Sequence, residues 1–193
     1  MLKIISGGQT GVDRAALDGA LKHAIDCGGW VPAGRLDEFG RIPDRYPVKE
    51  LEENNKEGRS LDRPGGLPPS QSYGAPGETA APLEKRDVFA ARTLQNVESS
   101  DGTAIIYCNE LRGGTEKTAG FCIEQKHPYL LIDAGKVPAE HAAYLITKFV
   151  REEDINTLNV AGPRESEWSG GYDYAFRALD IFLSTYKMSD ERK

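Results

Sequence analysis

The sequence predicts an α/β fold in which helices cover both faces of a mostly parallel sheet. Five short apolar runs are typical of buried strands, at residues 2–5, 27–32, 103–107, 129–133 and 157–161. Between and after these runs, apolar residues recur every three or four positions, which is the periodicity of amphipathic helices. Strands that alternate with helices in this way favour parallel pairing, because each parallel connection needs a crossover.

Composition narrows the class of protein. With 193 residues, 39% of them hydrophobic, the chain is long enough for one domain that spans residues 1–193. The net charge of −6 disfavours nucleic-acid binding, because an acidic surface repels phosphate backbones. Cys27, Cys108 and Cys122 form neither a disulfide framework nor a metal pair, which fits a reducing compartment. With no targeting or membrane-length apolar segment visible, we expect a cytoplasmic protein that binds no membrane.

The helices follow the strands in order. The first carries apolar residues from Val12 to Ile25, and a second is expected over residues 86–97. The next begins near the glycines at 113–114 and continues through Ile123. Ala142 to Phe149 mark another helix, and residues 172–186 carry a clear apolar stripe. The polar tail at 189–193 is expected to fray.

Residues 54–85 differ from the rest of the chain. They hold five Gly and five Pro among 32 positions, a composition that cannot bury enough apolar surface to offset its ordering entropy. We interpret this segment as a flexible loop inserted into the domain. Whether it closes over a site as a lid or is only a tolerated surface loop stays open.

Three polar loops that leave predicted strands share one character: residues 6–14 (SGGQTGVDR), 112–118 (RGGTEKT) and 159–166 (NVAGPRES). The carboxyl ends of parallel strands meet at one edge of a sheet, where ligands bind. Glycine lets backbone N–H groups approach a ligand, and the first turn of the next helix leaves N–H donors unpaired. Together these features attract anions. The sequence therefore predicts a pocket for a phosphate-bearing small molecule.

The candidate ligand-binding residues are the glycines, hydroxyls, cations and neighbouring polar groups of these loops. They are Ser6, Gly7, Gly8, Gln9, Thr10, Gly11, Asp13, Arg14, Gly113, Gly114, Thr115, Thr118, Gly162, Pro163, Arg164 and Ser166. Asp13 either favours its helix dipole or accepts hydrogen bonds from a ligand. We find no Walker loop, no G-x-G-x-x-G fingerprint, no catalytic triad and no metal-ligand spacing. The pattern favours binding or carriage over catalysis, and we assign no catalytic residue and no metal ligand.

A family likeness rests on an ordered set of segments that covers nearly the whole chain, apart from residues 54 to about 85. The segments are KIISGGQTGVDRAALD, GGWVPAGR, IPDRYPVKE, SSDGTAIIY, GGTEKT and LNVAGPRES. The set resembles the molybdenum-cofactor carrier proteins, in a circularly permuted branch of the Rossmann-like SLOG superfamily.

The resemblance implies a Rossmann-like fold and a carrier for the molybdenum cofactor, a pyranopterin with a terminal phosphate whose own dithiolene holds the metal. SGGQTG, GGT and AGPR would line the pocket for this molybdopterin ligand. The resemblance also implies a homo-oligomer, and the carrier role implies a molybdoenzyme as the recipient.

A second reading stays open within the same superfamily, which includes phosphoribohydrolases that act on nucleoside monophosphates and carry P-G-G-x-G-T-x-x-E. Here residues 112–116 lack the proline, the spacer glycine and the correctly placed glutamate. The alternatives to a carrier are therefore a nucleotide-binding protein, such as a sensor, or a nucleotide N-glycosidic or phosphate hydrolase.

Overall fold

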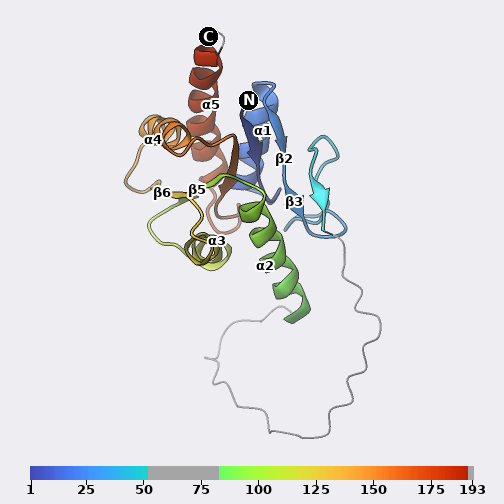
Figure 1. Ribbon diagram of the computed structural model, residues 1–193. Helices are drawn as coiled ribbons and strands as arrows, with labels where there is room; N and C mark the ends of the chain where they lie inside the picture. Colours follow the sequence, from blue (N-terminus) through green and yellow to red (C-terminus); the bar gives the residue numbers. More distant parts are fainter. Residues whose placement is uncertain (52–82, 191–193) are drawn as a thin grey trace, which may run out of the picture.

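A five-stranded parallel sheet forms the centre of the protein. The computed structural model describes residues 1–51 and 83–190 (Figure 1). The strands are β1 (Lys3–Ile5), β2 (Asp26–Gly28), β5 (Gly102–Tyr107), β6 (Tyr129–Asp133) and β7 (Thr157–Ala161). They lie in the order β2-β1-β7-β5-β6, and every neighbouring pair is parallel. The α/β fold class expected from the sequence is confirmed, and each of the five expected strands overlaps one strand of this sheet.

The position of β7 reveals the circular permutation directly. This strand is the last in the chain, yet it lies between β1 and β5, pairing Thr157 with Lys3 and Asn159 with Thr103. If β7 is counted first, the strands lie in the order 3-2-1-4-5, which is the doubly wound Rossmann order. The strand order therefore reverses between β7 and β5. That switch point is where such sheets bind ligands.

Helices cover both faces of the sheet, as expected. On one face lie α1 (Val12–Lys22), α4 (Ala139–Glu152) and α5 (Gly171–Asp190); on the other lie α2 (Leu83–Glu98) and α3 (Gly113–Glu124) (Figure 1). Successive side chains of strand β5 point to opposite faces of the sheet and pack against the helices on each face. Ala104 and Ile106 pack into the core with α1, α4 and α5, whereas Ile105 packs with Val97 of α2 and Cys122 of α3.

Two helix ends differ from the sequence expectation. Helix α2 begins at Leu83, inside the final residues of the segment expected as a loop over 54–85. Leu83, Glu84 and Lys85 are good helix formers that directly follow the last proline of that segment. Helix α5 runs to Asp190, into the tail expected to fray. The remaining positions of both segments, 54–82 and 191–193, lie outside the described residues.

The predicted second strand is divided at Gly29. Its φ of +129° and a hypothetical Cβ only 2.0 Å from the Ser6 carbonyl oxygen leave room for glycine alone. The chain then forms β3 (Trp30–Val31), which pairs in parallel with β4 (Lys49–Glu50) in a small second sheet. The segment at 32–48 packs on α1 through Ile42 and Tyr46. This packing holds the segment beside the β1 loop.

Candidate functional site

A pocket of about 550 Å³ opens at the switch point, between the loops that follow β5 and β7. Its wall combines the three predicted loops with one face of α2. The lining residues are Gly7, Gln9, Asp13, Phe89, Ala90, Arg92, Thr93, Asn96, Gly113, Gly114, Thr115, Lys117, Thr118, Asn159, Ala161, Gly162, Arg164 and Glu167. The volume lies within the range of small-molecule sites.

The first turn of α3 forms one end of this pocket. Arg112, the N-cap residue, makes no side-chain cap, and its carbonyl accepts the N–H groups of Thr115 and Glu116. Within residues 1–51 and 83–190, the N–H groups of Gly113 and Gly114 donate no hydrogen bond. Thr115 is only 3% exposed, and its hydroxyl has no hydrogen-bond partner in the same part of the chain. This end therefore presents two amide donors and one buried hydroxyl with unused bonding capacity.

A carboxylate and a guanidinium meet at another part of the wall, beside Gly7. Asp13 is 4% exposed, and its Oδ2 accepts a hydrogen bond from the Gln9 N–H at 3.3 Å. Arg92 of α2 donates from Nη1 to the Gly7 carbonyl at 3.1 Å, while its buried Nε has no partner within the described ranges. A Cβ on Gly7 would lie 2.8 Å from both Arg92 Cζ and Asp13 Oδ2. Glycine at this position therefore leaves the space that both charged groups occupy.

Burial changes the acid–base behaviour of this pair. Desolvation raises the pKa of Asp13 above its ordinary value, although the Arg92 charge and the Gln9 hydrogen bond oppose it. Desolvation likewise lowers the pKa of Arg92, against the opposite effect of Asp13. Each group would be still more perturbed without the other.

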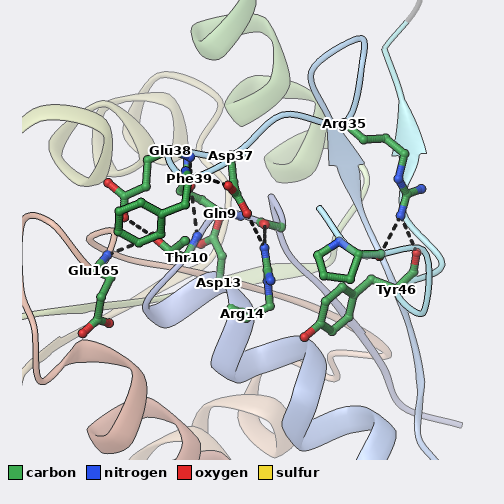
Figure 2. A network of polar contacts seen from close by, with 12 residues as sticks. Gln9, Thr10, Asp13, Arg14, Arg35, Asp37, Glu38, Phe39, Tyr46 and Glu165 are labelled. Carbon is green, nitrogen blue, oxygen red and sulfur yellow. Dashed lines mark hydrogen bonds and ion pairs between the residues drawn. The ribbon is translucent and has the colours of Figure 1, made fainter. Parts of the chain in front are cut away.

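The carboxylate of Glu38 accepts hydrogen bonds from two of the residues that were predicted to bind an anion, Thr10 and Ser166. Glu38, between β3 and β4, accepts hydrogen bonds from the hydroxyls of Thr10 and Ser166 and, at 3.2 Å, from the Ser166 N–H. The Glu165 N–H donates to the Thr10 hydroxyl at 3.0 Å (Figure 2). Desolvation would raise the pKa of Glu38, but the hydrogen bonds from Ser166 and Thr10 and the nearby Arg164 hold it below its ordinary value. Thr10 and Ser166 thus tie the 32–48 segment to the β1 and β7 loops.

Arg14 is engaged in the same neighbourhood. Its Nη2 donates to Asp37 at 2.7 Å and to the Gly8 carbonyl at 3.2 Å, and its guanidinium lies 4.9 Å from the Tyr46 ring centre (Figure 2). Arg14 borders a separate hollow of about 290 Å³ together with Thr10 and Gly11. These contacts favour a structural role for its charge.

The sixteen candidate residues thus fall into two groups. Those that line the main pocket are Gly7, Gln9, Asp13, Gly113, Gly114, Thr115, Thr118, Gly162 and Arg164. Those that lie outside its lining are Ser6, Gly8, Thr10, Gly11, Arg14, Pro163 and Ser166. Ser6, for example, is fully buried and donates to the Val160 carbonyl at 2.7 Å, which joins β1 to β7.

Sequence reasoning missed the contribution of α2. Arg92 and Asn96 both line the pocket, and they are four positions apart on the predicted helix, so they share one of its faces. That polar pair was the available signal. Asn96 also exchanges hydrogen bonds of 2.9 Å with the backbone N–H and carbonyl of Trp30, which fixes α2 beside β3. Lys117 of α3 is a further cation at the pocket that the sequence analysis did not select.

Within residues 1–51 and 83–190, no three His, Cys, Asp or Glu side chains are grouped so that they could hold a metal ion. In that same part of the chain, no helix is both long enough and apolar enough to cross a membrane.

Comparisons with known proteins agree with this geometry. Residues 4–62 and 78–183 match the model of the circularly permutated YpsA SLOG family. Among solved structures, the chain is similar to a crystal structure from Syntrophus aciditrophicus SB described as a "putative molybdenum carrier protein". The identity is 39% over 95% of each chain, and the TM-score is 0.73. A search of curated proteins gave no match. The family match and the permuted strand order together show that this chain belongs to the circularly permuted YpsA branch of the SLOG family.

Proposed function

We propose that this protein binds and carries a phosphate-bearing small molecule in the switch-point pocket, and that its cargo is the molybdenum cofactor. The observation that carries the proposal is the buried Thr115 hydroxyl, which lacks a partner within the described residues and lies beside the open N–H groups of Gly113 and Gly114. A buried polar group left unpaired costs about 1–3 kcal/mol, so a phosphate oxygen at this point would stabilise the folded chain. The N-terminus of a helix favours such an anion.

The remainder of the pocket suits the cargo. Lys117 and Arg164 add positive charge around the α3 turn, although Glu167 pairs with Arg164 at 3.0 Å. Phe89 and Ala90 of α2 give an apolar surface on which a ring system can lie. The dithiolene of the cofactor would hold the molybdenum, so the protein would need to contact only the phosphate and the ring system of the cofactor. The 39% identical structure described as a molybdenum carrier supports the choice of cargo.

The test is a titration of the protein with purified molybdenum cofactor, followed by native mass spectrometry and calorimetry. We expect one bound cofactor per chain in the wild type. Thr115→Val keeps the shape of the side chain and should weaken binding about tenfold or more, since a hydrogen bond to a charged group contributes about 1.5–3 kcal/mol. Thr147→Val on α4 is the matched control, because its hydroxyl bonds within its own helix to Ala143, away from this pocket. Absence of a bound mass, or equal affinity for both variants, would contradict the proposal.

A nucleotide hydrolase is the second candidate, and one observation favours it. The Asp13 carboxyl lies in the pocket wall, and the raised pKa that burial gives it suits a general acid. Incubation with nucleoside monophosphates and chromatography of the products tests this role. If the wild type releases free base and free phosphate no faster than an Asp13→Asn variant does, the hydrolase candidate is excluded.

We also propose a homo-oligomer and a molybdoenzyme recipient, which the family resemblance of the sequence implies, and a cytoplasmic location, which three cysteines without a disulfide framework favour. Sedimentation of the purified protein tests the oligomer, and transfer of cofactor to an apo-molybdoenzyme tests the recipient.

A further inference from the structure

The charged pair beside Gly7 has an unusual arrangement. Asp13 and Arg92 both border the pocket, yet no ion pair or hydrogen bond within the described ranges joins the two side chains directly. The Asp13 Oδ2 accepts from the Gln9 N–H, and the Arg92 Nη1 donates to the Gly7 carbonyl. The Arg92 Nε, although buried, has no partner in that part of the chain. An acceptor side chain and a donor side chain therefore line one pocket from adjacent positions, and the buried Arg92 Nε has unused bonding capacity.

Their chemistry selects one kind of ring. A carboxylate accepts two parallel N–H bonds, and a guanidinium donates to a carbonyl oxygen. The 2-amino-4-oxopyrimidine ring, which pterins and guanine share, offers a carbonyl oxygen followed by two N–H donors along one edge. The same edge of adenine offers an amino group and a bare ring nitrogen, which would set a lone pair against the carboxylate. Because unpaired polar groups in a buried site are penalised, the site would reject adenine.

We propose that Asp13 and Arg92 form a subsite for the 2-amino-4-oxopyrimidine edge of the ligand. Asp13 accepts hydrogen bonds from the two ring-edge N–H groups, and the Arg92 Nε donates to the ring carbonyl. The inference rests on the proposed function, because the α3 turn must first hold the phosphate of the ligand in this pocket. Phe89, which also lines the pocket, gives the ring plane an aromatic surface.

The surroundings of Asp13 are consistent with such a role. Desolvation raises its pKa in the protein without ligand, and two N–H donors from a ligand would favour the ionised form. Glycine at position 7 leaves room for both side chains, since any Cβ there would press on them. The adjoining pocket of about 550 Å³ provides the space for the ring. The subsite therefore has space, a donor and acceptors for this ring edge.

The experiment compares four phosphate monoesters by calorimetry: GMP, AMP, XMP and neopterin monophosphate. For the wild type we expect GMP and neopterin monophosphate to bind at least tenfold more tightly than AMP. Asp13→Asn should lose that preference and gain at least tenfold in affinity for XMP. An asparagine amide can donate to the 2-oxo group of xanthine, which the carboxylate repels. A misfolded variant could not show such a gain.

Inorganic phosphate serves as the control ligand, and a thermal shift with it shows whether the wild type and Asp13→Asn each keep the anion site. If AMP binds as tightly as GMP and neopterin monophosphate, or Asp13→Asn gains nothing for XMP, the ring subsite is wrong even though phosphate esters bind. If no phosphate ester binds at all, the proposed function itself fails, and the subsite with it. Tighter binding of neopterin monophosphate than of GMP would identify a pterin ligand, and the reverse order a guanine nucleotide; either order supports the subsite.

Discussion

The Arg14 guanidinium and the Asp37 carboxylate lie 2.7 Å apart, with side chains that are 15% and 6% exposed. This ion pair joins α1 to the segment between β3 and β4, and Asp37 follows Arg14 by 23 positions in the sequence. It explains why Arg14, a cation of the first glycine loop, lies away from the main pocket. The charge of Arg14 holds that segment in place.

Replacement of Asp37 by asparagine should therefore weaken the fold and leave the ligand affinity unchanged. Removing one partner of a mostly buried pair leaves a charge uncompensated, and we expect a loss of about 1–3 kcal/mol in the free energy of unfolding. Urea denaturation measures it. Asp44→Asn is the control, because its ion pair with Arg41 is exposed and should contribute less than about 1 kcal/mol. Equal effects of the two variants would show that the Arg14–Asp37 pair does not hold the segment.

Gly114→Val should reduce affinity for phosphate esters at least tenfold while the protein stays folded. No atom lies within 4 Å of a Cβ built on Gly114, so the side chain enters open space at the pocket and blocks access to the N–H groups. Gly120→Val in the same helix is the matched control, since its Cβ is equally unobstructed and lies away from the pocket lining. Calorimetry with GMP compares the two. If both variants bind as the wild type does, the phosphate lies elsewhere.

Gly7→Ala should alter selectivity between ring systems more than affinity for phosphate. The added methyl would displace the ends of the Asp13 and Arg92 side chains, which are 2.8 Å from its position. Both ends belong to side chains rather than to backbone, so the fold should tolerate the change. We expect the ratio of GMP to AMP affinity to fall at least fivefold, while the thermal shift with inorganic phosphate is retained. A GMP to AMP affinity ratio equal to that of the wild type would count against the ring subsite.

Glu38→Gln should destabilise the protein at neutral pH and have little effect in acid. The folded state holds the pKa of Glu38 below its ordinary value, so the carboxylate stabilises the fold above the unfolded pKa. That stabilisation is lost as the pH falls through the lower, folded-state pKa. The unfolding free energies of wild type and variant, measured by urea from pH 7 to pH 3, should therefore converge at the acid end. The exposed Glu124 provides the comparison, as Glu124→Gln should follow the wild type throughout. A difference for Glu38→Gln that does not change with pH would contradict this origin of the stability.

The sequence predicted most of the main sheet because its strands are marked by local composition. The apolar runs at 103–107 and 129–133 became β5 and β6 at the same or nearly the same bounds. The convergence of three glycine loops also followed from a general rule, since parallel strands bring their carboxyl ends to one edge. The pocket at the switch point contains residues from all three.

The parts that the sequence did not predict depend on contacts between distant residues. Strands β3 and β4 have two residues each, too few to show any periodicity, and their pairing requires the turn at Gly29. Glu38 contacts Thr10, which is 28 positions away in the sequence, and Ser166, which is 128 positions away. Likewise, the helical pattern of α2 places Arg92 and Asn96 on one face, but it does not reveal that Arg92 extends to the Gly7 carbonyl, 85 positions earlier.

The location of β7 has a consequence for how the chain is synthesised and folded. β1 and β2 can pair early, and so can β5 and β6, but these two halves have no shared edge until the strand at 157–161 enters between them. A nascent chain that lacks this strand would expose two open sheet edges, which are templates for aggregation. Shortened chains that end before residue 157 should therefore fail to assemble a single core. The sheet can therefore become compact only after residues 157–161 have been synthesised.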